Sequence, residues 1–157
     1  MSSTILTDPN ACQKVSNLLG QLLADTYVLY VKTQNFHWNV VDARFYFLHK
    51  MLEEQYEELA EAVDLIAERI RGLGYKSPAS MKQFLELTML EEASTDLNAN
   101  QMILQLAEDH QVISRSLHAK IDEGNKYHDD GTVDLFIERL RAHDKTAWML
   151  RSHFQAS

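Results

Sequence analysis

The sequence predicts an all-α protein folded as a four-helix bundle, and three observations support this fold class. The chain has 157 residues, of which 45% are hydrophobic, enough for one domain with a single core. Only 5 Gly and 2 Pro occur, too few for an all-β fold with many turns or for a disordered chain. Four long segments repeat apolar residues at the three-four spacing of helices with one buried face. We expect a single domain over residues 1–157.

The first two helices have recognisable ends. Asp8-Pro9 is a capping residue followed by a first-turn proline, and the apolar spacing continues to about His37. Asp42 is a plausible cap for a second helix, and Gly72 and Gly74 end it. The apolar face of this second helix consists of Phe45, Leu48, Leu52, Tyr56, Leu59, Val63, Ile66 and Ile70.

The segment that follows the second helix is too long for a simple turn. After Ser77-Pro78, the apolar residues between 81 and 87 predict a short amphipathic helix. Thr88-Met89-Leu90-Glu91 matches a capping box, which predicts a third long helix from Thr88 to Gly124. Residues 125–131 form a loop, and Thr132 starts a last helix that reaches Phe154. A long second connection carrying a short extra helix predicts ferritin-like topology for the bundle, in place of simple up-down-up-down order.

The net charge, the cysteine count and the lack of long apolar runs limit the functions and locations expected for this protein. The formal net charge is −8, which argues against a basic nucleic-acid surface. The single cysteine, Cys12, cannot form an intrachain disulfide, and a reducing compartment is expected. The N-terminus lacks a basic segment followed by an apolar stretch, and no run approaches 18 apolar residues. We therefore expect a cytoplasmic protein with no membrane partner.

Most of the candidate metal-binding residues lie on the second predicted helix. Residues 51–75 hold seven acids against two bases, which by itself is most simply a solvated helix face. However, His49 and Glu53 are four residues apart, and so are Asp64 and Glu68, so each pair shares one face and can hold an ion. His37 adds a further imidazole a short loop away. None of the seven histidines follows a glutamate by three residues, which excludes the intrachain di-iron centre of a helical bundle.

The two pairs cannot bind the same ion within one chain. His49 and Asp64 are 15 residues apart, or about 22 Å along a helix. Two copies packed antiparallel about a twofold axis would place His49 and Glu53 of one beside Asp64 and Glu68 of the other. The spacing therefore predicts a dimer with two metal sites at its interface.

These residues resemble the Dps miniferritins, the DNA-binding proteins from starved cells. The matching motifs are Asn35-Phe36-His37-Trp38-Asn39, then His49 with Glu53, then Asp64 with Ala67-Glu68-Arg69-Ile70, and the likeness covers nearly the whole chain. It implies a ferroxidase centre of His37, His49 and Glu53 from one subunit with Asp64 and Glu68 from its mate. It also implies a homododecamer built from twofold dimers that stores oxidised iron and protects against oxidative stress. Some members have Asp at the position of Glu53.

The resemblance also implies the reactants. Imidazole and carboxylate ligands with open positions suit Fe²⁺ and stabilise Fe³⁺ once it forms. The usual oxidant in the family is hydrogen peroxide. Trp38 follows a ligand and is expected either to accept stray oxidising equivalents or to pack in the protein. The remaining helical histidines, His110, His118, His143 and His153, are expected to be surface or hydrogen-bonded residues.

Three acidic residues near the start of the last helix have two possible roles. Asp129, Asp130 and Asp134 surround a helix N-terminus, where carboxylates are electrostatically favourable. The resemblance implies instead that acids of this region line threefold pores that attract Fe²⁺.

Two other functions compete with iron oxidation. Family members that bind DNA often carry a Lys/Arg-rich terminal arm, but residues 1–13 and 152–157 contain neither residue, so non-specific DNA condensation is the weaker alternative. A purely structural bundle would tolerate neutral replacement of the acidic pairs.

Overall fold

The computed structural model describes residues 8–154. Within them lie four long helices and one short one: α1 (Pro9–Asn39), α2 (Phe45–Gly72), α3 (Met81–Leu87), α4 (Ala99–Lys126) and α5 (Asp130–Arg151). No strand occurs among these residues, so the all-α prediction is confirmed. None of the helices within residues 8–154 combines the length and apolarity needed to cross a lipid bilayer.

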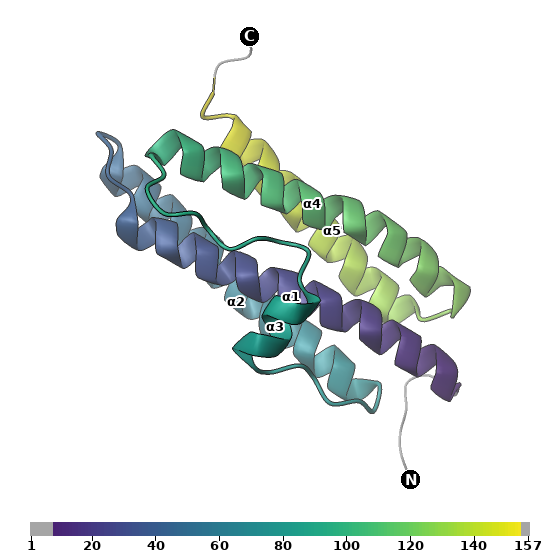
Figure 1. The fold of residues 1–157 in the computed structure, drawn as a ribbon. Coiled ribbons are helices and arrows are strands. Elements are labelled where there is room, and N and C mark those ends of the chain that lie inside the picture. Colours follow the sequence, from purple (N-terminus) through teal and green to yellow (C-terminus); the bar gives the residue numbers. More distant parts are fainter. Residues whose placement is uncertain (1–7, 155–157) are drawn as a thin grey trace.

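The long helices form two antiparallel pairs, α1 with α2 and α4 with α5, which lie against each other as a bundle (Figure 1). Short turns join the helices within each pair, whereas the α2–α4 connection crosses from one end of the bundle to the other (Figure 1). The short helix α3 packs on the side of α1 within this connection. The long-crossover topology expected from the sequence is therefore present.

The core fills the space between the two helix pairs. Phe36 on α1 and Phe136 on α5 are its largest fully buried side chains, and leucine and isoleucine from all four long helices surround them. Every apolar residue predicted for the α2 face from Leu48 onward is buried or half-buried. Phe45 is the exception, with 44% of its surface exposed, because it begins the helix.

The predicted start of the third long helix is wrong. Residues 88–98 are not helical, and α4 begins at Ala99 with a capping box formed by Asn98 and Gln101. The Thr88 hydroxyl and the Met89 amide both donate to the buried carboxylate of Asp25 on α1, each at 2.7 Å. Both groups donate to Asp25 Oδ1 and so do not cap a helix, and the connection stays extended along the bundle.

Other boundaries moved by a few residues. Arg44, and not Asp42, is the residue before α2, although Asp42 accepts a hydrogen bond from the Arg44 amide at 2.8 Å in the preceding turn. The last helix begins at Asp130, two residues before Thr132, and ends at Arg151 instead of reaching Phe154. Asp129 caps it by accepting from the Thr132 amide at 3.1 Å. The α4–α5 loop is correspondingly shorter than predicted.

Candidate metal centre

The turn between α1 and α2 brings His37 and His49 together. Their imidazole rings stack with centroids 3.8 Å apart and planes 11° from parallel. His37 is 5% exposed and His49 is half-buried, so the pair lies at the edge of the core near one end of the bundle. The antiparallel geometry of the hairpin explains the meeting, since the last turn of α1 faces the first turns of α2.

Each histidine is oriented by the backbone of the other. His37 Nδ1 lies 2.7 Å from the His49 carbonyl oxygen, and His49 Nδ1 lies 2.8 Å from the His37 carbonyl oxygen. A carbonyl oxygen can only accept, so both Nδ1 atoms carry a proton, and in the neutral form of each ring the lone pair is on Nε2. Metal-binding histidines are commonly fixed in this way, with one nitrogen held by a carbonyl and the other left for the ion.

Glu53 supplies a carboxylate one helical turn after His49. Its Oε2 lies 2.9 Å from the Lys50 ammonium. The hydrogen bond from Lys50 holds the pKa of the Glu53 carboxyl below its usual value, and the nearby His37 and His49 act in the same direction. The side chain therefore carries its negative charge at neutral pH, as a ligand for a cation must.

Asp64 and Glu68 lie elsewhere on α2. Both are exposed, and continuous helix separates them from His49 along α2. Within residues 8–154 of one chain, no group of three or more His, Cys, Asp or Glu side chains is arranged to hold a metal ion. The structure thus brings His37 and His49 together, with Glu53 near them, and leaves the two remaining predicted ligands apart.

The three acids around the start of α5 differ in accessibility. Asp129 is 2% exposed, and its carboxylate is bound by the Arg69 guanidinium at 2.6 Å and by the Thr132 hydroxyl at 2.6 Å. Asp130 and Asp134 are exposed. Asp134 also lines a cavity of about 290 Å³ between α2 and α5, together with Glu68 and Glu138. The sequence did not single out Glu138, which stands four residues after Asp134 on the same helix face.

A second histidine pair, which the sequence did not predict, lies between α4 and α5. His110 and His143 are fully buried, and their Nδ1 atoms are 2.8 Å apart. Arg139 can only donate, so His143 Nε2, at 3.3 Å, accepts from it; His143 Nδ1 then donates to His110 Nδ1. Burial lowers the pKa of both imidazoles, that of His110 to about 3, so both are neutral. These two residues are hydrogen-bonded, as expected, though with each other.

Comparison with known proteins places this arrangement in a family. The ferritin-like domain matches residues 16–156. An uncharacterised low-temperature-induced protein of Nostoc sp. (strain PCC 7120) is 43% identical over 152 residues, covering 96% of this chain and 84% of that protein. DNA protection during starvation protein 2 of Bacillus anthracis is 35% identical, with 89% and 96% covered.

A solved structure of a relative has the same fold. The Dps protein of Vibrio cholerae O1, described as a member of a broad superfamily of ferritin-like diiron-carboxylate proteins, superposes with a TM-score of 0.92 at 27% identity. The match covers 99% of this chain and 98% of that one. The helix order, the long crossover and the sequence likeness agree, and the chain belongs to the Dps family of ferritin-like proteins.

Proposed function

We propose that this protein binds Fe²⁺ at sites shared between two chains, oxidises it with hydrogen peroxide and stores the ferric product inside a hollow homododecamer. The observation that carries the proposal is the His37–His49 pair, whose two Nε2 lone pairs are left available beside the ionised Glu53. The description of the V. cholerae relative as a diiron-carboxylate protein supports iron as the metal.

The incomplete ligand set supports a shared site. Asp64 and Glu68 are exposed carboxylates on α2, and Leu65 between them is an apolar side chain with 52% of its surface exposed. All three side chains are open to solvent in one chain, so a second chain packed on α2 would reach both carboxylates. An antiparallel twofold pairing would bring these acids to His37 and His49 of the mate.

The chemistry follows from the ligand types. Imidazole nitrogens and carboxylate oxygens bind Fe²⁺ and favour Fe³⁺ after oxidation. Two Fe²⁺ ions give one electron each to one hydrogen peroxide molecule, whose O–O bond breaks without release of a hydroxyl radical. The ferric ions then hydrolyse to a mineral, and the enclosed space of a dodecamer would hold it. The family's link to starvation and stress fits protection against oxidative damage in the cytoplasm.

The accessible acids of α5 would guide iron inward. Three copies of Asp130 and Asp134 around a threefold axis would attract Fe²⁺ through a ring of carboxylates. Asp129 belongs to the same predicted pore, but its carboxylate binds Arg69 and Thr132, so its part there would be to hold the loop in place.

DNA binding is the competing function, because the B. anthracis relative is named for DNA protection. We place it second since a chain with net charge −8 repels phosphate. Retardation of plasmid DNA by the iron-free protein at low salt and pH 7 would favour it.

The proposal is tested by anaerobic titration with Fe²⁺, followed by addition of hydrogen peroxide and light scattering on the same sample. We expect a dodecamer that binds two Fe²⁺ per shared site and oxidises both. Glu68→Gln should weaken binding, while His118→Ala, at an exposed α4 position, should leave it unchanged. A monomer with full ferroxidase activity would refute the shared site.

A further inference from the structure

A continuous row of aromatic rings leads away from the histidine pair. Tyr56 on α2 packs edge to face on His37, with centroids 5.1 Å apart, and on Tyr30 of α1 at 6.0 Å. Tyr30 contacts Tyr27 at 5.7 Å, and Tyr27 stacks on Phe84 of α3 at 4.5 Å. Each separation lies within the range of direct ring contact. The row therefore connects the candidate iron site with the outer side of α1 without a gap.

Three of these rings are phenols, and packing alone does not require the hydroxyl groups. Phenylalanine would fill the same space, yet Tyr30 keeps a hydroxyl that accepts a hydrogen bond from the Gln34 amide at 3.0 Å in a partly buried position. Tyrosine loses one electron and its phenolic proton far more readily than phenylalanine does. The chemistry that separates the two residue types is thus one-electron oxidation.

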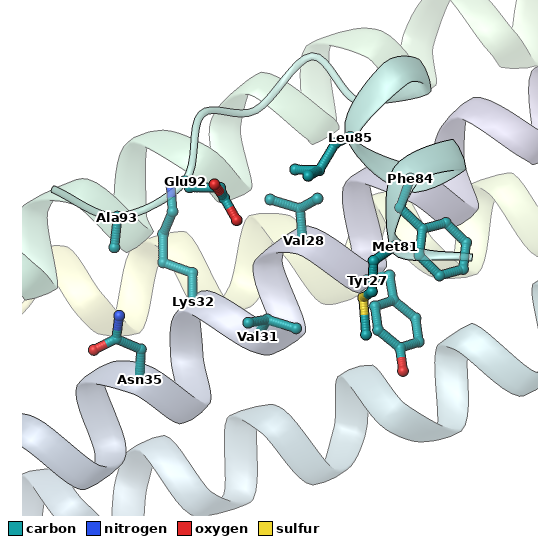
Figure 2. Close-up of a pocket in the computed structure, with 10 residues that line it drawn as sticks. All are labelled: Tyr27, Val28, Val31, Lys32, Asn35, Met81, Phe84, Leu85, Glu92 and Ala93. Atoms are coloured by element: carbon teal, nitrogen blue, oxygen red, sulfur yellow. The ribbon is translucent and has the colours of Figure 1, made fainter. Parts of the chain in front are cut away.

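The far end of the row opens on a cavity. Tyr27 and Phe84 line a space of about 310 Å³ between α1, α3 and the extended connection. Figure 2 shows Tyr27 in the wall of this cavity, together with Met81, whose thioether is another oxidisable group. An oxidising equivalent that reached Tyr27 would be separated from the histidines by Tyr56 and Tyr30.

We propose that Tyr56, Tyr30 and Tyr27 supply an electron when hydrogen peroxide meets a single Fe²⁺ at the site; this inference rests on the proposed iron oxidation. One Fe²⁺ and one phenol together give the two electrons that cleave the O–O bond. The products are Fe³⁺, a tyrosyl radical, one hydroxide ion and one water molecule, and the water takes up the phenolic proton. The radical then moves from Tyr56 to Tyr30 and Tyr27 as each phenol in turn gives up an electron and a proton.

Trp38 offers a different destination for the same oxidant. It follows His37 in the sequence, is 65% exposed and has no place in the row of ring contacts. A radical on Trp38 would lie at the surface, whereas the tyrosine row leads along the α1–α2 interface. The two routes differ in the identity of the radical and in the variants that abolish it.

The test is freeze-quench electron paramagnetic resonance of the full protein, loaded anaerobically with one Fe²⁺ per site and mixed with hydrogen peroxide. We expect a tyrosyl signal that Tyr56→Phe largely removes. Tyr127→Phe is the matched control, since its hydroxyl bonds Glu123 at the opposite end of the bundle, and it should leave the signal intact. Loading two Fe²⁺ per site should reduce the wild-type signal, because iron then supplies both electrons.

Spin trapping in the same samples provides a second readout. At one Fe²⁺ per site, Tyr56→Phe should release more hydroxyl radical than wild type. The absence of a tyrosyl signal at one Fe²⁺ per site, together with normal oxidation at two Fe²⁺ per site, would overturn the tyrosine row and leave the proposed function standing. A tryptophan radical that Trp38→Phe abolishes would also overturn the tyrosine row and leave the proposed function standing. Failure to oxidise iron at two Fe²⁺ per site would overturn both.

Discussion

The two histidine pairs of this bundle have the same composition and opposite surroundings. His37 and His49 join α1 to α2 and direct their Nδ1 protons to backbone carbonyls, which leaves both Nε2 atoms available. His110 and His143 join α4 to α5 and use Nδ1 on each other, in a fully buried position. The difference teaches that the partner of each ring nitrogen, more than the presence of a histidine pair, separates a candidate metal ligand from a structural residue.

The charges around the pairs differ in the same sense. Glu53 places a carboxylate near His37 and His49, which favours a bound cation. Arg139 places a guanidinium on His143, and the Arg139 side chain also pairs with Glu58 on α2. A metal ion at the buried pair would meet a positive charge, so this pair is suited to holding the helices together.

The largest expected effect is on iron oxidation by His49→Ala. Altering a residue that only supports a metal ligand typically costs 10–100-fold, so loss of a ligand should slow oxidation by about 100-fold or more. Stability should change little, because His49 is half-buried at the end of the bundle. Stopped-flow absorbance of the ferric product measures the rate, and circular dichroism checks the fold. A rate within a few-fold of wild type would remove His49 from the site.

The matched change at the other pair is His143→Ala. It should leave the iron oxidation rate of the folded protein unchanged and lower the free energy of unfolding by about 2–5 kcal/mol. The substitution opens a cavity, leaves His110 without its hydrogen-bond partner and removes one of the two partners of Arg139. Urea unfolding at fixed protein concentration measures this loss. Lost oxidation in a protein that remains folded would erase the distinction between the two pairs.

The buried pair also predicts a dependence of stability on pH. The pKa of His110 is lowered to about 3 and that of His143 is also lowered, so below about pH 6.5 the unfolded chain binds protons that the folded chain does not. The stability contributed by the neutral histidines is present above pH 6.5 and falls as pH drops, by up to about 1.4 kcal/mol per pH unit for each histidine.

Urea unfolding between pH 7.5 and 5 measures this dependence. The double variant His110→Gln/His143→Gln removes both titrating groups and is the control for the carboxylates, which titrate in the same experiment. Its stability should vary less with pH than that of wild type. Equal slopes for the two proteins would show that the pair is protonated in the folded state.

The smallest expected effect concerns Lys50. Its ammonium binds the Glu53 carboxylate at 2.9 Å and competes with an arriving cation, but half of the Lys50 side chain is exposed and exposed ion pairs are weak. Lys50→Ala should therefore tighten anaerobic Fe²⁺ binding by less than about fivefold. Weaker binding would mean that Lys50 positions Glu53 for the metal.

The sequence was sufficient for most of the helices, because their apolar spacing is long and regular. The likeness to Dps proteins implied His37, His49 and Glu53 as metal ligands, which stays a prediction, and the structure brings the two histidines together. The sequence placed the start of the third long helix wrongly at Thr88, since the role of Thr88 depends on a buried acid 63 residues away. The reciprocal bonds of His37 and His49 run to backbone carbonyls, which leave no mark in a sequence. The His110–His143 pair likewise depends on the register between two helices.

The central claim, a site shared between chains, is tested most directly by mixing variants. The His49→Ala and Asp64→Ala variants should each be inactive when expressed alone. The two chains are then coexpressed one to one with different tags, so that mixed assembly can be verified. Random twofold pairing would leave about a quarter of the sites with every ligand intact, so we expect about a quarter of the wild-type rate. Wild type mixed equally with His49→Ala/Asp64→Ala should also give about a quarter. No recovery in the first mixture, with about half of the wild-type rate in the second, would contradict the claim and assign the site to a single chain.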